Sequence, residues 1–203
     1  MSTHPADIQV APGHTRASFI LRGALAVGAA YGAGAVAPFV TQSFAAVGQR
    51  DLAVVEFALG LEQLEAAFYK TALAKAGLSG KAKTLATEFG VHEADHVQAL
   101  TQLLSQVGGK APAPPRTKFG LTGQASFVKT AVTLEDVGVG AYNGAIPSLA
   151  SPDLASAFGS IVQIEARHSS ALRMLAGMDP APQAFDKPLT AQQAAAAAQQ
   201  FTR

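Results

Sequence analysis

Glu93-Ala94-Asp95-His96 and Glu165-Ala166-Arg167-His168 decide the fold of this chain, since both read Glu-x-x-His. Residues i and i+3 of an α-helix lie on one face, so the two side chains of each segment can reach one ion. Upstream of each segment, a glutamate precedes a tyrosine by seven residues, Glu62 before Tyr69 and Glu135 before Tyr142. The sequence therefore contains two copies of one helical hairpin, each with a lone glutamate followed by a Glu-x-x-His pair.

Glycines and prolines divide the chain around these segments into helices and connections. Two short connections predict antiparallel hairpins, and a proline-rich stretch, Gly108–Thr122, predicts one long crossover between them. Fully extended, that crossover spans about 50 Å, enough to run the length of a bundle. The sequence predicts an all-α fold, a four-helix bundle within residues 46–180, with helices over about 51–76, 79–107, 124–146 and 151–176.

The two ends of the chain have a different composition from the bundle. Gly23–Val40 is free of charge, Arg16 and Arg22 precede it, and Ser43-Phe44-Ala45 offers small residues for cleavage. This pattern predicts an export signal over residues 1–45, or a membrane anchor through residues 18–44. Residues 15–21 resemble a twin-arginine motif with Ala17 in place of the second arginine. We therefore expect export to the periplasm, the cell envelope or the extracellular space.

The C-terminal extension, residues 181–203, contains an alanine- and glutamine-rich tract at Ala191–Gln200. Such a tract is compatible with a weak helix on the outside of the bundle and with a frayed tail.

Composition limits the chemistry that the protein can perform. The chain has no cysteine, which excludes disulfides, thiolate nucleophiles and iron–sulfur clusters. Its formal net charge of +1 gives no electrostatic footprint for nucleic acid. Carboxylates, histidines and hydroxyls must therefore carry any activity.

One glutamate from each of two helices and Glu-x-x-His from the other two is the arrangement of a dinuclear carboxylate centre. Burying four ionised carboxylates without a cation would be prohibitive. Imidazole and oxygen ligands suit Fe or Mn, so we expect two Fe or two Mn ions. Tyr69, Tyr142 and His92 are either hydrogen-bond partners of the ligands or residues of the packed core.

Four segments of this chain, LEQLEAAFY, HEADHV, LEDVGVGAY and IEARHSSALR, resemble the ferritin-like superfamily. The resemblance covers roughly Asp51–Gly177 and is to exported ferritin-like proteins related to desiccation-related proteins. It implies that Glu93 and Glu165 bridge two metals. It also implies six ligands: Glu62, Glu93, His96, Glu135, Glu165 and His168. Glu65 is set aside because Glu62 has the seven-residue offset from Tyr69.

Three functions remain open. The first is redox chemistry with Fe(II), O2 or peroxide in a stress response, as a ferroxidase, a peroxidase or a catalase-like enzyme. The second is a structural, desiccation-protective bundle that metal only stabilises. The third is a zinc metalloprotease through His92-Glu93-x-x-His96, although the second copy has Ile164 where the first has His92. A homo-oligomer is compatible with all three.

Overall fold

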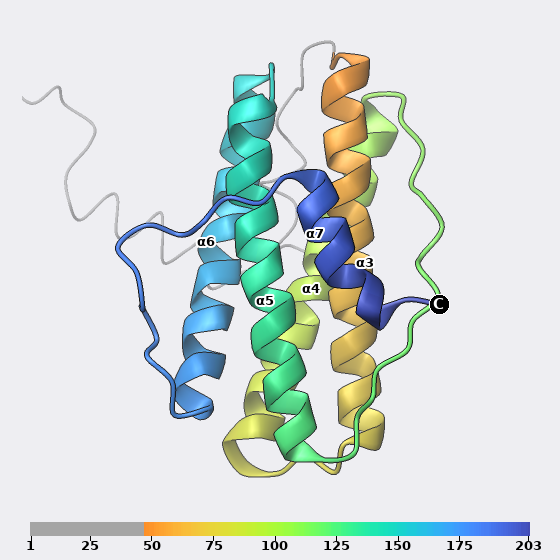
Figure 1. Cartoon of the computed structure of the whole chain (residues 1–203). Helices are drawn as coiled ribbons and strands as arrows, with labels where there is room; N and C mark the ends of the chain where they lie inside the picture. The colour runs from red at the N-terminus through yellow and green to blue at the C-terminus, as the bar shows by residue number, and fades with distance from the viewer. Residues whose placement is uncertain (1–46) are drawn as a thin grey trace, which may run out of the picture. The chain divides into compact units, whose positions relative to one another are not determined.

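The computed structural model describes residues 47–203, so the predicted export segment lies outside the described residues. Within this range the protein is all-helical, which confirms the predicted fold class (Figure 1). No described helix is long and apolar enough to cross a membrane. The elements are α3 (Gln49–Lys75), α4 (Gly80–Gln106), α5 (Gln124–Ala145), η1 (Ile146–Ser148), α6 (Pro152–Leu175), α7 (Ala191–Ala198) and η2 (Gln199–Phe201).

The two ends of α6 follow from local chemistry. Ser151 accepts a hydrogen bond from the backbone N–H of Leu154, and Pro152 occupies the first position of α6. Gly177 ends α6 with a φ of 71°, a conformation that costs little only for glycine. Each predicted helix agrees with the structure to within two residues at either end.

The four helices form two hairpins, α3 with α4 and α5 with α6. Their apolar side chains form two clusters, one around Phe68, Phe89 and Phe127 and one around Leu100 and Phe158. Along α4, the segment Glu93–His96 lies between Phe89 of the first cluster and Leu100 of the second. The Glu-x-x-His segments are therefore positioned at the level where one apolar cluster gives way to the other.

The C-terminal extension forms part of the packed structure. Its alanine-rich tract forms helix α7, which packs on α5 (Figure 1). Ala194, Ala198 and Phe201 are buried in the first apolar cluster. The backbone N–H of Lys118, in the crossover, donates to the carbonyl of Phe201 at 2.8 Å. The extension thus joins the crossover to the bundle, and the frayed-tail alternative does not hold.

Residues 180–189, here called the strap, reach α7 by crossing α5 at two glycines. The backbone N–H of Leu189 donates to the carbonyl of Gly140 at 2.8 Å. A Cβ atom on Gly144 would lie 1.9 Å from the carbonyl oxygen of Leu189, a distance that only backbone movement could relieve. The absence of a side chain at position 144 therefore allows the strap to dock.

Gly144→Ala is expected to displace the strap and destabilise the protein by about 1–3 kcal/mol, the usual effect of overpacking. The matched control is Gly159→Ala in α6, where an added Cβ meets nothing within 4 Å. In that helix, alanine should stabilise the protein by up to about 1 kcal/mol. Urea unfolding followed by circular dichroism measures both effects. Equal midpoints for the two variants would contradict this account of the strap.

Candidate metal centre

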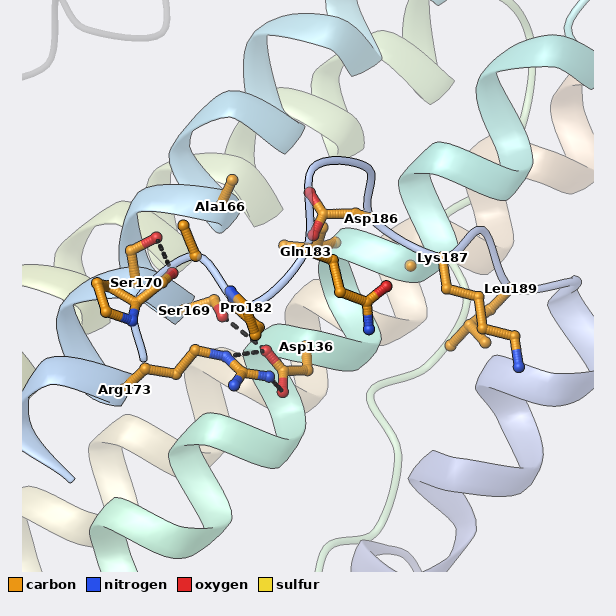
Figure 2. Close-up of a pocket in the computed structure, with 14 residues that line it drawn as sticks. Asp136, Ala166, Ser169, Ser170, Arg173, Pro182, Gln183, Asp186, Lys187 and Leu189 are labelled. Carbon is orange, nitrogen blue, oxygen red and sulfur yellow. Dashed lines mark hydrogen bonds and ion pairs between the residues drawn. The ribbon is translucent and has the colours of Figure 1, made fainter. Parts of the chain in front are cut away.

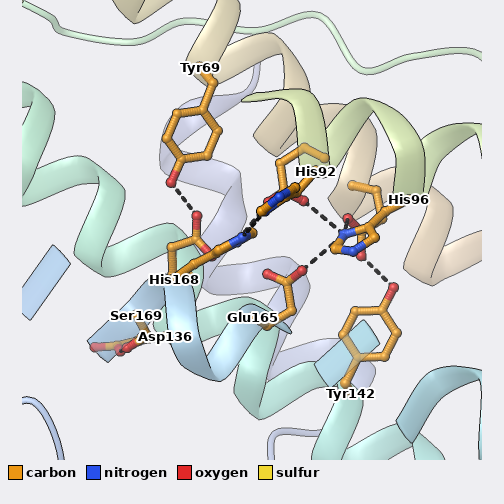
Figure 3. A network of polar contacts seen from close by, with 11 residues as sticks. Tyr69, His92, His96, Asp136, Tyr142, Glu165, His168 and Ser169 are labelled. Carbon is orange, nitrogen blue, oxygen red and sulfur yellow. Dashed lines mark hydrogen bonds and ion pairs between the residues drawn. The ribbon is translucent and has the colours of Figure 1, made fainter. Parts of the chain in front are cut away.

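Each of the four long helices places one fully buried glutamate at the centre of the bundle: Glu62 from α3, Glu93 from α4, Glu135 from α5 and Glu165 from α6. Two histidines accompany them (Figure 3). The side chain of His168 is 2% exposed and that of His96 is 12% exposed. All six side chains predicted as ligands therefore converge in one place.

The six side chains form two overlapping groups. In the first, ligand atoms of Glu62, Glu93, His96 and Glu165 all lie within 4.8 Å of one another. In the second, the same holds for Glu93, Glu135, Glu165 and His168. The groups share Glu93 and Glu165, the two glutamates expected to bridge. This geometry provides two adjacent sites joined by two carboxylates.

Each histidine presents its Nδ1 atom to the carboxylates. His96 Nδ1 lies 3.2 Å from Glu62 Oε2, 3.2 Å from Glu93 Oε2 and 3.1 Å from Glu165 Oε1. His168 Nδ1 lies 3.0 Å from Glu93 Oε1 and 3.3 Å from Glu135 Oε2. A neutral imidazole nitrogen so placed among carboxylate oxygens is a donor set for a borderline transition metal.

The two tyrosines bind the lone glutamates across the bundle. Tyr69, on α3, donates its hydroxyl hydrogen to Glu135 Oε1 on α5. Tyr142, on α5, donates to Glu62 Oε1 on α3. Each tyrosine thus orients the glutamate of the other hairpin, a pairing that the seven-residue offset within one helix does not reveal.

His92 holds the second histidine in place from the outer side. Its Nδ1 lies 2.9 Å from Nε2 of His168, and the two rings are nearly parallel, with 8° between their planes. Phe89 also stacks on the ring of His168, at a centroid distance of 4.0 Å. With Nε2 engaged in this way, Nδ1 of His168 is left to face the carboxylates. His92 belongs to neither ligand group found in the described residues, which favours the dinuclear arrangement over a zinc-protease site.

Burial and mutual repulsion perturb the acidic groups strongly. Burial raises the pKa of Glu93 to about 7, although both histidines oppose this change. Burial and the Glu93 carboxylate raise the pKa of Glu165 well above its ordinary value. Burial also acts to raise the pKa of Glu62, but the neighbouring His96 outweighs it and the pKa is lowered. Without a cation, the centre can therefore be held only as a mixture of protonated and ionised groups.

The pKa of His168 is also set by burial and by neighbouring charges that oppose each other. Burial lowers its pKa, but the neighbouring carboxylates of Glu135 and Glu93 raise it, with a net result of about 9.

Several buried polar atoms at this centre have no hydrogen-bond partner among the described residues. They include Oε1 of Glu93, Oε2 of Glu135, both carboxylate oxygens of Glu165 and Nδ1 of His168. A buried polar atom left without a partner costs about 1–3 kcal/mol. Because these atoms face one another, cations between them would satisfy all of them together. The residues present therefore fit a metal centre.

A fifth buried carboxylate, that of Glu65, lies beside the six predicted ligands. Its side chain is 3% exposed, and burial followed by the charge of Glu165 raises its pKa well above the ordinary value. Sequence reasoning set this residue aside. The available signal was its spacing of three residues from Glu62, which places both on the same helix face.

Asp136, the neighbour of Glu135, takes part in a different structure on the outside of the bundle. It accepts hydrogen bonds from Ser169 Oγ at 2.6 Å and from Arg173 Nε at 3.2 Å. These side chains line a surface cavity of about 290 Å³ between α5, α6 and the strap (Figure 2). Because Ser169 and Arg173 already hold the carboxylate of Asp136, this side chain is not available to the buried centre.

Comparisons with known proteins agree with this architecture. A family model described as a ferritin-like domain matches residues 50–178. The crystal structure of a conserved hypothetical protein, rv2844, from Mycobacterium tuberculosis has the same fold, with a TM-score of 0.58 and 17% sequence identity. The match covers 63% of this chain and 98% of that one. Among curated proteins, none matches significantly.

Proposed function

Since the chain belongs to the ferritin-like family, we propose that it binds two Fe or two Mn ions for redox chemistry with Fe(II), O2 or peroxide in a stress response. The observation that carries this proposal is the pair of four-residue groups that share Glu93 and Glu165. The proposal includes export, which rests on the composition of residues 1–45, and a kinship with desiccation-related proteins.

One ion would be held by Glu62, Glu93, His96 and Glu165, and the other by Glu93, Glu135, Glu165 and His168. Bound Fe or Mn would supply one-electron changes of valence. The protein's own part is to hold the ligands. Tyr69 and Tyr142 fix the lone glutamates, and the apolar clusters on either side exclude bulk water.

Small molecules would approach the centre from the side of α4. His96 is the most exposed of the six expected ligands, with 12% of its side chain accessible, whereas the four glutamates are fully buried. A molecule the size of O2 or peroxide arriving there would meet the imidazole before the carboxylates.

Metal analysis and Fe(II) oxidation together test this function. Protein purified without chelator should hold about two Fe or Mn ions per chain, and it should oxidise added Fe(II) in air faster than buffer alone. Glu93→Gln should lose both properties, whereas Glu88→Gln, an exposed position on the same helix, should keep them. One tightly held Zn, with proteolysis abolished by Glu93→Gln, would instead support the zinc-protease alternative.

The structural alternative has its own supporting observation, because the centre ties all four long helices together at mid-height. In that case, the protein would bind two metals and be stabilised by them. It would oxidise Fe(II) no faster than buffer and would not consume peroxide. The oxidation assay therefore separates the two functions, while the metal count does not.

A further inference from the structure

The two histidines of the candidate centre are held in different ways. His168 is 2% exposed, its Nε2 atom lies 2.9 Å from Nδ1 of His92, and Phe89 stacks on its ring. His96 is 12% exposed, and its Nε2 atom has no hydrogen-bond partner among the described residues. By the repeat of the two hairpins, the residue that would support His96 as His92 supports His168 is Ile164, which has no polar side-chain atom. Only one of the two histidines is therefore fixed from behind.

The α5–α6 hairpin is also tied together on its outer surface, at the level of the second group. Asp136 and Ser169 directly follow the expected ligands Glu135 and His168 in the sequence. Ser169 Oγ donates to Asp136 Oδ1 at 2.6 Å, and Arg173 donates to both oxygens of the same carboxylate, from Nε at 3.2 Å and from Nη2 at 2.5 Å (Figure 2). A guanidinium that binds both oxygens of a carboxylate fixes their relative geometry. We call Asp136, Ser169 and Arg173 the outer clamp.

The α3–α4 hairpin has different residues at the positions of the outer clamp, namely Gln63, Val97 and Thr101. The amide of Gln63 donates to the carbonyl of Pro112 in the crossover, at 3.3 Å, and not to α4. Val97 has no polar side-chain atom, and Thr101 is exposed. The outer clamp therefore has no counterpart beside the first group.

These differences bear on how tightly each group would hold a metal ion. Ligands that are already in position bind more tightly, because less conformational freedom is lost on binding. Hydrogen bonds that orient ligands from outside typically change metal affinity by about 10- to 100-fold. The second group has such support at its histidine and between its two helices, whereas the first group has neither. The first group also contains His96, the most exposed of the six expected ligands, so ions can enter and leave on that side.

We propose that the two groups bind metal unequally: the second group fills first and keeps its ion, while the first group takes up and releases ions. This inference rests on the proposed metal site. His92 and the outer clamp act as positioning residues, since they hold ligands of the second group without touching the metal. An Fe(II) ion taken up as a substrate would enter the first group, beside an ion that stays in the second.

Titration of the metal-free protein with Mn(II) against a competing indicator tests the order of filling. The wild-type protein should bind two ions in separate steps, with affinities that differ by about 10-fold or more. His168→Ala should abolish the tighter step, and His96→Ala should abolish the weaker one. Equal affinities in the wild-type protein, or loss of the tighter step in His96→Ala, would overturn the proposal. Failure of the wild-type protein to bind Mn(II) at all would overturn the proposed function itself.

Ser169→Ala and Asp136→Asn test the outer clamp in the same titration without removing a ligand. Each should lower the affinity of the tighter step by about 10-fold and leave the weaker step unchanged. Thr101→Ala is the matched control, because Thr101 occupies the position in α4 that is equivalent to Arg173 in α6, and it should change neither step. A general loosening of the bundle would weaken both steps together, and that result would overturn the positioning role.

Two substitutions of His92 separate its hydrogen bond from its contribution to packing. His92→Gln keeps a polar side chain that can accept a hydrogen bond from Nε2 of His168, whereas His92→Ala removes it. The tighter step should therefore be weakened in His92→Ala and largely restored in His92→Gln. An unchanged tighter step in His92→Ala would show that His92 does not position the second group.

Discussion

Removal of metal at pH 8 is expected to lower the melting temperature of the protein by more than ten degrees, and by much less at pH 5. The four glutamates are fully buried and face one another. Each unpaired buried charge costs several kcal/mol, and 1 kcal/mol shifts the melting temperature of a domain of this size by about 2–4 °C. Differential scanning calorimetry of loaded and chelated protein at pH 5, 8 and 9 measures the difference.

The pH dependence of the metal-free protein follows from the direction of the pKa shifts. Glu93 has a folded-state pKa of about 7 against an ordinary 4.5, so its contribution is present below pH 4.5 and is lost as the pH rises through 7. His168 has a pKa of about 9 against 6.5, so its contribution is complete below 6.5 and is lost through 9. Both groups therefore make the metal-free protein less stable from pH 5 to pH 9.

Glu62 acts in the opposite sense. Its lowered pKa gives stability that is present above its ordinary value of 4.5 and is lost only in stronger acid, so it does not change the trend between pH 5 and 9. Equal melting temperatures of loaded and chelated protein at both ends of this range would contradict a shared buried site.

The bundle and the convergence of the six candidate ligand side chains could be predicted from the sequence because each depends on local spacing. Glu-x-x-His fixes two side chains on one helix face, and Ser151-Pro152 fixes the start of α6. Such features need no knowledge of which helices are neighbours. Local spacing does not choose between Fe and Mn, because the same donor set suits both metals.

The features that sequence reasoning missed depend on packing between distant segments. Tyr69 binds Glu135, in the other hairpin, because the crossover brings α3 and α5 together, and helical spacing within α3 carries no record of that. The docking of Leu189 on Gly144 likewise joins segments 45 residues apart in sequence. Gly144 looks like a weak helix former until the atoms that occupy its space are known.

Glu93→Gln should remove both metal ions, whereas Glu135→Gln should remove mainly one. Glu93 contributes a ligand atom to both groups, and Glu135 contributes only to the second. Glutamine keeps the shape of the side chain but removes the charge that balances the metals. After gel filtration, elemental analysis should therefore find close to zero ions per chain in the first variant and about one in the second. Retention of one ion by Glu93→Gln would show that the carboxylate is not shared.

Glu93→Gln should stabilise the metal-free protein, although it weakens metal binding. Above pH 7, folding of the metal-free chain requires Glu93 either to take up a proton or to bury a charge among four other carboxylates. Glutamine needs neither, so the metal-free variant should melt at a higher temperature than the metal-free wild type at pH 8, with the two converging toward pH 5. A residue that only packs the core would lower stability in both states, with no dependence on metal. The reversal of sign between loaded and metal-free protein therefore identifies Glu93 as a ligand.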